Sequence, residues 1–299
     1  MLQIKNTLGG GGANVTIDGV KVKDKLDLIT ELMDVSGSTL PYNFYYGCAV
    51  VLNNEIHILG GYYGSSGTSH YKWNGSSWTS VSTLPYEFYK GCAVVLNGEI
   101  HILGSGNSSY NRRHYKWNGS SWTSVSTLPY SFYSGSAVVL NGEIHILGSS
   151  GQDTNHCKWN GSSWTYLSDL PYNFSGGSAV VINNEIHILG TSNSSYYTAH
   201  YKWNGSSWTS VSTLPYNFYY GCAVVLDGEI HILGGKANAT KHYKWNGSSW
   251  TSVSTLPYSF YSGSAVVLNN EISILGSENG TSTNLLHYIL QIKRYKEVA

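Results

Sequence analysis

Residues 47 to 61 read GCAVVLNNEIHILGG, and five edited copies of this stretch follow along the chain. The copies begin at Gly91, Gly135, Gly177, Gly221 and Gly263, so the repeat length is 42 or 44 residues. Each copy contains a run rich in β-branched residues, a two-residue turn such as Asn97-Gly98, and a second run of the same kind. Asn-Gly pairs supply the positive φ angles that tight hairpins require. Each copy therefore predicts an antiparallel hairpin.

The second half of each unit predicts another hairpin. After a loop of seven to ten residues comes a stretch such as HYKWNGSSWTSVSTLP at 70–85. Its core, WNGSSW, recurs unchanged at 117–122, 159–164, 203–208 and 245–250. Each unit is thus a four-stranded antiparallel meander, and one such sheet cannot bury both of its faces alone. Six copies predict an all-β fold, a six-bladed β-propeller whose sheets pack face to face around an axis.

The unit resembles the kelch repeat, in which the second strand ends in a glycine doublet and the third and fourth strands carry spaced aromatic residues. Gly60-Gly61 and Gly234-Gly235 match the doublet, and Tyr71 with Trp78 matches the aromatic pair. The resemblance covers about residues 32 to 299 and implies a kelch-like propeller. The WD-type propeller is the rival, but the Trp-Asp signature is absent from the sequence.

The match to the kelch pattern is incomplete. Four copies replace the second glycine, with Ser105, Ser149, Thr191 and Ser277, and Cys157 replaces the tyrosine of the third copy. These departures leave the predicted architecture intact. They weaken any transfer of function from kelch proteins to this chain.

The two ends of the repeat array predict how the ring closes. The last unit has two strands at 263–276 and a third through His287-Tyr288, but no NGSSW hairpin follows them. Residues 32–41, LMDVSGSTLP, read like a fourth strand whose tryptophan has become Leu32. We therefore expect the N-terminal strand to complete the sixth blade.

The chain divides into two predicted regions. Residues 31–299 form the propeller, and residues 1–30 form a short attachment element. Within that element, residues 15–22 predict a hairpin on Asp18-Gly19, and Lys23 to Met33 have helical spacing.

The loops of a meander alternate between the two edges of its sheet. The short turns, such as Asn53-Asn54 and NGSS, share one side of the ring, which we call the constant face. The loops between the second and third strands share the other side with the loops that join successive units, and we call this the variable face. Every difference in repeat length falls in the loops between the second and third strands. The loops that join successive units read LPYxFYxG, in which the two positions marked x change most.

The composition of the variable face is typical of binding loops. Its loops read GYYGSSGTS, SGNSSYNRR, SSGQDTN, TSNSSYYTA and GKANATK. Tyrosine offers a large contact area at low entropy cost, while Ser, Asn and Gly adapt their hydrogen bonding, and aromatic faces beside amides and hydroxyls suit sugars. The alternative is that surface loops simply drift and that Gly and Ser mark turns. The candidate ligand-binding residues are Asn43, Tyr46, Tyr62, Tyr63, Glu87, Lys90, Tyr110, Arg112, Arg113, Tyr196, Tyr197, Tyr220 and Lys236.

Charge narrows the range of partners. The chain has 17 basic and 17 acidic residues, and no long run of either sign occurs. We therefore expect no nucleic-acid partner. No stretch approaches the ~18 apolar residues of a membrane span, and MLQIKNTLGGGG lacks the apolar segment of a secretory signal. We expect no membrane insertion, and a location in the cytoplasm or on a virion or cell surface reached by a non-classical route. The oligomeric state does not follow from the sequence.

The histidines and cysteines follow the repeat. All eleven histidines fall in two registers, exemplified by His57 and His70, and each unit offers at most two of them with no carboxylate at constant spacing on that face. This pattern predicts hydrogen-bonded structural histidines rather than metal ligands. Cys48 shares its register with serines of other copies, which predicts a small buried side chain rather than a disulfide. No metal and no cofactor are expected.

Few carboxylates remain for chemistry. The glutamates that begin the second strands, such as Glu55, should pair with lysines such as Lys72 across the sheet. On the variable face only Glu87, Asp153 and Glu278 remain, each in a different unit, with Asp169 nearby. General acid–base catalysis needs groups close together, so we expect no enzyme. Some kelch-like propellers are sugar-modifying enzymes or copper oxidases, and the resemblance keeps a sugar-modifying enzyme as an alternative.

These observations predict a non-catalytic binding module. We expect its variable face to recognise a glycan or a cell-surface glycoprotein. The alternatives are a protein–protein interaction module or a structural scaffold, for example a component of a phage or bacterial surface.

Overall fold

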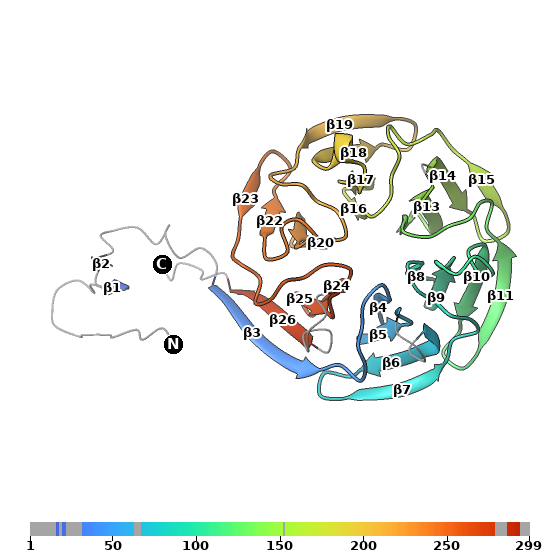
Figure 1. The fold of residues 1–299 in the computed structure, drawn as a ribbon, viewed down its shortest axis with the longest axis horizontal. Coiled ribbons are helices and arrows are strands. Elements are labelled where there is room, and N and C mark those ends of the chain that lie inside the picture. The colour runs from blue at the N-terminus through green and yellow to red at the C-terminus, as the bar shows by residue number, and fades with distance from the viewer. Residues whose placement is uncertain are drawn as a thin grey trace.

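The computed structural model describes residues 16–17, 20–21, 32–62, 67–151, 153–278 and 286–293. In this part of the chain, six four-stranded antiparallel sheets form a ring around a central axis (Figure 1). The first strand of each blade lies nearest the axis and the fourth forms the outer rim. The predicted six-bladed β-propeller is confirmed.

The strands follow the repeat closely. Blade 1 contains β4 (Cys48–Leu52), β5 (Glu55–Leu59), β6 (Ser69–Trp73) and β7 (Trp78–Thr83), and blade 2 contains β8 (Cys92–Leu96), β9 (Glu99–Leu103), β10 (Arg113–Trp117) and β11 (Trp122–Thr127). Blade 3 contains β12 (Ser136–Leu140), β13 (Glu143–Ser149), β14 (Asp153–Trp159) and β15 (Trp164–Tyr166), and blade 4 contains β16 (Ser178–Ile182), β17 (Glu185–Leu189), β18 (Ala199–Trp203) and β19 (Trp208–Thr213). Blade 5 contains β20 (Cys222–Leu226), β21 (Glu229–Leu233), β22 (His242–Trp245) and β23 (Trp250–Ser252).

Blade 6 is built from both ends of the chain. It contains β24 (Ser264–Leu268), β25 (Glu271–Leu275), β26 (Leu286–Lys293) and β3 (Leu32–Thr39), in that order across the sheet. β3 pairs antiparallel with β26 from Leu286↔Thr39 to Lys293↔Leu32. The prediction that the N-terminal strand closes the ring is confirmed.

The N-terminal region contains the predicted hairpin in part. β1 (Thr16–Ile17) pairs antiparallel with β2 (Val20–Lys21). Of the predicted helix over Lys23 to Met33, residues 23–31 lie outside the described residues. The prediction is wrong for Leu32 and Met33, because pairing with β26 makes them strand.

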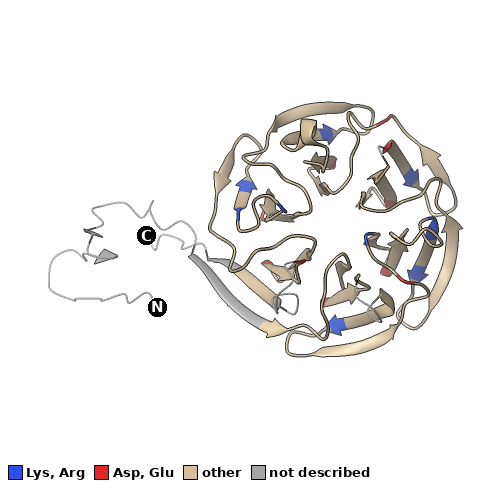
Figure 2. Ribbon diagram, in the orientation of Figure 1, with Lys and Arg blue, Asp and Glu red and all other residues tan. Residues whose placement is uncertain are grey.

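Among the described residues, helix is limited to short 3₁₀ turns, of which η3 (Ser194–Tyr196) is one. Among those residues, no helix has the length and apolar character needed to cross a membrane. Charged residues are scattered around the ring rather than gathered in one part of it in the ribbon of Figure 2.

The core lies between neighbouring blades. Six hydrophobic clusters each combine residues of two adjacent blades, and the cluster between blades 6 and 1 includes Phe44, Ile58 and Leu275. All three side chains are fully buried. Because complete burial of a large apolar side chain stabilises the fold by roughly 1.5–3 kcal/mol, the interfaces between blades hold the ring together.

Hydrogen bonds also cross every interface near the axis. In three interfaces a thiol donates to a glycine carbonyl, as from Cys48 to Gly91 at 3.1 Å. In the other three a serine hydroxyl accepts from an alanine N–H, as Ser264 does from Ala49 at 2.9 Å. Cys48, Cys92, Cys157 and Cys222 are free thiols. Cysteine and serine both occur in this register because either side chain can form a hydrogen bond to a neighbouring blade.

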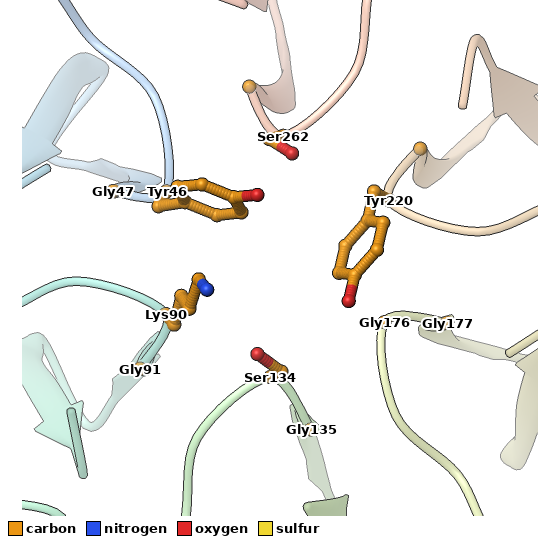
Figure 3. Close-up of a pocket in the computed structure, with 12 residues that line it drawn as sticks. Tyr46, Gly47, Lys90, Gly91, Ser134, Gly135, Gly176, Gly177, Tyr220 and Ser262 are labelled. Carbon is orange, nitrogen blue, oxygen red and sulfur yellow. The ribbon is translucent and has the colours of Figure 1, made fainter. Parts of the chain in front are cut away.

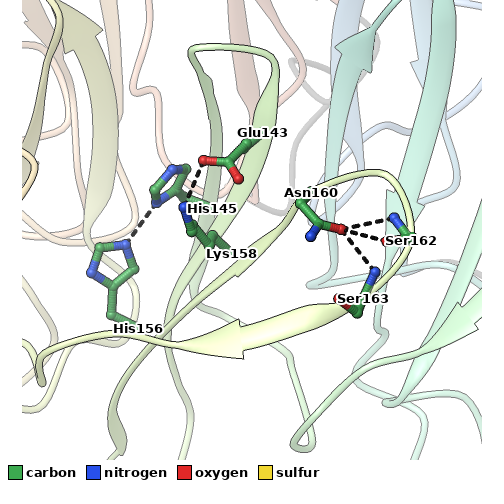
Figure 4. Close-up of polar contacts among 7 residues, drawn as sticks. All are labelled: Glu143, His145, His156, Lys158, Asn160, Ser162 and Ser163. Atoms are coloured by element: carbon green, nitrogen blue, oxygen red, sulfur yellow. Dashed lines mark hydrogen bonds and ion pairs between the residues drawn. The ribbon is translucent and has the colours of Figure 1, made fainter.

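The histidines form buried pairs inside the blades. His145 Nδ1 lies 2.8 Å from His156 Nε2 (Figure 4), and the same contact occurs in blades 1, 2, 4 and 5. The third-strand histidine also packs edge-on against a tryptophan of the next blade, as His70 does against Trp117 at 5.5 Å between ring centroids. The prediction of hydrogen-bonded structural histidines is confirmed.

The constant face carries the predicted ion pairs and turns. Lys158 Nζ lies 2.9 Å from Glu143 Oε2, and Lys72 lies 2.9 Å from Glu55 Oε2. In each NGSS turn the asparagine side chain accepts three hydrogen bonds from the two following serines, as Asn160 does in Figure 4. The recurrence of the NGSS sequence is explained by the turn that it forms, because the asparagine side chain holds this turn in shape.

Candidate functional site

The LPYxFYxG loops are fixed to the blades by their constant residues. Tyr42 donates its hydroxyl hydrogen to the Gly60 carbonyl at 2.8 Å, and Phe44 is fully buried between blades. A Cβ added at Gly47 would lie 2.4 Å from the Phe44 ring and 2.8 Å from the Leu59 carbonyl. The tyrosine contact recurs in the other five blades. Tyr, Phe and Gly are therefore constant because they anchor the loop.

The glycine doublet helps to hold the same loops. In blade 1 the Gly61 N–H donates to the Phe88 carbonyl at 2.9 Å. Where the second glycine is replaced, the new hydroxyl donates to a carbonyl of the LPYxFYxG loop that precedes its own blade, as from Ser105 to Glu87 at 2.7 Å. The same bond occurs at Ser149, Thr191 and Ser277. The side chains that replace the second glycine thus anchor the preceding loop, whereas the Gly61 N–H anchors the following one.

The second variable position of each loop lies at the axis. These six residues form a closed ring of backbone hydrogen bonds, in which each N–H donates to the carbonyl of the same position in the preceding blade at 2.6 to 2.7 Å. We call this set the mouth ring: Tyr46, Lys90, Ser134, Gly176, Tyr220 and Ser262. Because the ring uses backbone atoms alone, its side chains are free to differ between blades.

The mouth ring has an uncommon backbone conformation. All six members are left-handed, with φ between +55° and +66°. This region costs a residue other than glycine on the order of 1–2 kcal/mol, and such residues cluster at functional sites. Five of the six members are not glycine, so the fold accepts this cost to hold side chains at the mouth.

A small pocket opens at the centre of the mouth ring. It has a volume of about 120 Å³ and is lined by the six ring members and the glycine that follows each of them. Tyr46, Lys90 and Tyr220 supply the long side chains, whereas Ser134, Ser262 and Gly176 leave the rest of the opening uncovered (Figure 3). Small-molecule sites usually enclose ~300–1,000 Å³. This pocket is therefore sized for one group of a ligand rather than a whole one.

The polar groups of the mouth contact one another. Lys90 Nζ lies 4.5 Å from the centre of the Tyr46 ring, and Ser262 Oγ donates to Glu278 Oε2 at 3.0 Å. Burial, with a further contribution from a hydrogen bond to Glu278, raises the pKa of the Tyr46 hydroxyl. The phenol therefore stays protonated at neutral pH, and its oxygen can accept a hydrogen bond from a ligand.

Tyrosines extend from the mouth in two directions. On one side the Tyr46 ring contacts Tyr62 at 6.2 Å between centroids, and Tyr62 contacts Tyr89 at 4.9 Å. On the other side Tyr220 contacts Tyr219 at 5.7 Å, and Tyr219 stacks on Tyr197 at 4.9 Å. The two arms meet where Tyr46 and Tyr220 lie 6.4 Å apart. We call these residues the tyrosine band: Tyr197, Tyr219, Tyr220, Tyr46, Tyr62 and Tyr89.

The structure brings together five of the residues that the sequence marks as candidates. Tyr46, Lys90 and Tyr220 belong to the mouth ring, and Tyr62 and Tyr197 belong to the tyrosine band. Tyr62 is 54% exposed, whereas the other four are half-buried.

The remaining candidates have other contacts. Tyr110 packs against Tyr86 and Tyr196 stacks on Tyr172, each against the anchored tyrosine of an LPYxFYxG loop. Arg112 donates to the carbonyls of Leu128 and Pro129. Glu87 accepts from the Asn107 amide at 3.0 Å. Arg113 and Lys236 are exposed and Asn43 is half-buried, while Tyr63 lies outside the described residues.

Sequence reasoning missed Tyr89 and Tyr219 of the band. Both occupy the position before the mouth ring, which is tyrosine in five of the six loops and Ser175 in the other. This constancy favoured a structural role. The sequence marks Glu278 as a carboxylate of the variable face but not as a candidate ligand-binding residue. Its contact with Ser262 brings it to the mouth.

No metal site is evident in the part of the chain that the structure describes. No three His, Cys, Asp or Glu side chains among those residues form a cluster that could hold an ion. In each histidine pair the facing nitrogens bond to each other, as in His57 and His70, so they are not directed at a common ligand position.

No family model matches the sequence, and no curated protein sequence matches it. Among solved structures, the chain is similar to one described as the structure of YjhT. The TM-score is 0.73 at 16% sequence identity, over 87% of this chain and 97% of that one. The likeness is one of fold. It agrees with the β-propeller seen here, and the site must be interpreted from its own residues.

Proposed function

We propose that the chain is a non-catalytic binding module whose variable face recognises a glycan or a cell-surface glycoprotein. The observation that carries the proposal is the tyrosine band, which spans the mouth ring and the pocket at its centre. Tyrosine rings pack on the C–H patches of sugars, and the hydroxyls of Tyr46 and Ser134 add hydrogen-bonding groups at the mouth. The half-buried rings also keep few rotamers, which lowers the entropy cost of binding.

The arrangement of carboxylates supports binding over catalysis. Glu87 bonds to Asn107, Glu278 bonds to Ser262, and Asp153 lies in β14 of a third blade. Acid–base catalysis needs two such groups within reach of one substrate bond. A sugar-modifying enzyme remains the less favoured alternative, and loss of turnover in Glu87→Ala or Asp153→Ala variants would support it.

A protein partner is the second candidate. Tyr62 is 54% exposed beside Tyr46 and Tyr89, and clustered tyrosines are frequent hot spots of protein interfaces. In this form the chain would act as an interaction module or scaffold, for example on a phage or bacterial surface. Binding that survives glycosidase treatment of the target supports a protein partner, and binding that is lost supports sugar recognition.

We also propose that the chain is a divergent kelch-type propeller. Its support is the glycine after each second strand, which is left-handed in all six blades, from Gly60 to Gly276. A Cβ there would approach a carbonyl of the next loop to about 2 Å, as at Gly104 and the Phe132 oxygen, where the distance would be 1.9 Å. The packing thus requires glycine at this position, and the kelch pattern has a glycine at the same position.

The deciding experiment is a glycan array probed with the purified protein and with a variant carrying Tyr46→Ser, Lys90→Ser and Tyr220→Ser. The variant should fold, because Ser134 and Ser262 already occupy the mouth ring with φ of 55° and 56°. Selective binding that the variant loses supports a lectin-like module. Binding that the variant keeps argues against the mouth as the site, and absence of binding by the native protein argues against free glycans as ligands.

A further inference from the structure

We infer that the ligand of the variable face is an unbranched, neutral polysaccharide chain, held along the tyrosine band across the mouth rather than by a terminal sugar inside it. This inference rests on the proposed glycan-binding function. It adds the shape and charge of the ligand and the direction in which it lies.

The pocket at the mouth is too small to enclose a whole ligand. At about 120 Å³, it is well below the ~300–1,000 Å³ that encloses a small ligand. A terminal sugar would have most of its surface outside the pocket. Contacts beyond the pocket must therefore supply much of the affinity, and the tyrosine band lies beside the pocket on both sides.

The tyrosine band continues on both sides of the pocket. Its six rings follow one another at centroid distances of 4.9 to 6.4 Å, which is comparable to the length of one sugar ring in a chain. The pocket lies near the middle, because Tyr46 and Tyr220 both line it. Tyr62 and Tyr89 continue beyond it on one side, and Tyr219 and Tyr197 on the other. A ligand that uses both arms must continue in both directions from the mouth, as an internal segment of a polymer does.

One side of the mouth ring has no long side chains. A Cβ added at Gly176 would lie 2.8 Å from Cε1 of Tyr220, so the glycine lets the Tyr220 ring lie against the backbone. The loop of that blade has Ser175 where five others have tyrosine. Within the mouth ring, aromatic side chains are confined to Tyr46 and Tyr220, whose rings contact each other, and the ring offers none on the side of Ser134 and Gly176 that would enclose a compact ligand.

The charges at the mouth nearly cancel. At the mouth, Lys90 places its ammonium over the Tyr46 ring, and Glu278 accepts a hydrogen bond from Ser262. One cation and one carboxylate offset each other, and the six members of the band are uncharged tyrosines. A strongly acidic polymer would meet no cluster of cations here, so a neutral chain fits the site best.

The test uses length series of unbranched neutral glycans with one to eight sugar units, made from α-glucan, β-glucan, chitin, mannan and galactan, printed beside branched and acidic glycans. We expect binding to at least one neutral series, with affinity rising with chain length until the band is covered. A monosaccharide should bind at least about 100-fold more weakly than the longest oligomer, which is ~2.8 kcal/mol.

Variants at the two ends of the band separate the arms. Tyr89→Ser and Tyr197→Ser should each weaken binding of the longest oligomers about tenfold, ~1.4 kcal/mol, and leave the shortest binding oligomers unchanged. The matched control is Tyr196→Ser, which removes a neighbouring tyrosine that is 38% exposed but stacks on Tyr172 outside the band. This control should bind like the native protein.

The outcomes distinguish the inference from the proposed function. Binding to branched or acidic glycans alone, or equal affinity for a monosaccharide and its polymer, overturns the inference and leaves glycan recognition standing. The inference also fails if Tyr196→Ser weakens binding as much as Tyr197→Ser does. Silence of the native protein on every glycan overturns both.

Discussion

The Nδ1 atom of His57 lies 2.8 Å from the Nε2 atom of His70, and the His70 ring packs edge-on against Trp117 of the next blade. An N–H···N bond of this kind needs one ring nitrogen with a proton and one without. The contact therefore requires at least one neutral imidazole and resists protonation of both. Because the same arrangement recurs around the ring, it connects the stability of the propeller to pH.

Acid should destabilise the protein in a window set by these pairs. Burial lowers the pKa of His57 to about 4, and burial with the charges of His57 and Lys72 lowers the pKa of His70 to about 3. The unfolded chain has histidines with pKa values near ~6.5, so it binds more protons than the folded chain below that pH. The free energy of unfolding should be constant above about pH 7.5 and fall as pH decreases from ~7 to ~5, a range above the usual carboxylate pKa values. Denaturant unfolding at each pH measures this dependence.

The sixth blade provides a control for the pH effect, because Ser273 stands where the other blades have the second-strand histidine. A His57→Ser variant should show a slope of unfolding free energy against pH that is shallower, by up to about one proton. A slope equal to that of the native protein would contradict the assignment to the pairs.

Two glycines of blade 2 should respond very differently to alanine. Both have positive φ, +64° at Gly104 and +78° at Gly98, but a Cβ at Gly104 would lie 1.9 Å from the Phe132 carbonyl oxygen, whereas nothing lies within 4 Å of one at Gly98. Gly98→Ala should cost only the backbone term of roughly 1–2 kcal/mol. Gly104→Ala should cost about 4 kcal/mol or more. Equal losses in thermal or denaturant unfolding would show that the close approach to Phe132 is unimportant.

The four thiols should be unreactive in the folded protein. Burial raises the pKa of Cys48, Cys157 and Cys222 to about 12 and raises that of Cys92 as well. Alkylation needs the thiolate, so labelling by iodoacetamide at pH 8 should be roughly a thousandfold slower than for a free cysteine. Mass spectrometry should find unlabelled native protein and four labels after denaturation. Rapid labelling of any one native thiol would be inconsistent with its raised pKa.

Closure of the ring should depend on β3. Deleting residues 1–39 removes the strand that pairs with β26 along its whole length, and we expect no cooperative unfolding transition from the product. Deletion of residues 1–31 keeps β3 and serves as the control. A synthetic peptide of residues 32–41 added to the longer deletion should restore the transition in a concentration-dependent way. A well-folded product without the peptide would show that five complete blades suffice.

The fold was predictable because the repeat is nearly literal. Asn97-Gly98 and the NGSS turns marked the hairpins, and the missing last hairpin with the strand-like residues 32–41 identified the closing strand. The helical spacing over Lys23 to Met33 was misleading at its end, since Leu32 and Met33 pair with β26. Strand pairing between distant parts of the chain overrode a local pattern.

The candidate site was predictable only in part. Variation within LPYxFYxG pointed to Tyr46, Lys90 and Tyr220, because a position that differs between otherwise equal blades is one that the fold leaves free. The neighbouring residues Tyr196 and Tyr197 could not be separated from sequence, since the loop conformation decides that one stacks on Tyr172 and the other on Tyr219. The left-handed backbone of the mouth ring also depends on all six blades together, and no single loop reveals it.

The pairing of Leu32 with Lys293 has a mechanical consequence. Both ends of the propeller leave blade 6 at the same point on its constant face, so tension between residues 31 and 294 pulls on one end of the β3–β26 ladder. The hydrogen bonds of that ladder would then break one after another instead of sharing the load. A tether attached through a single terminus avoids this unzipping and keeps the mouth turned away from the anchor. The propeller is therefore better suited to the tip of a structure under load than to a link within it.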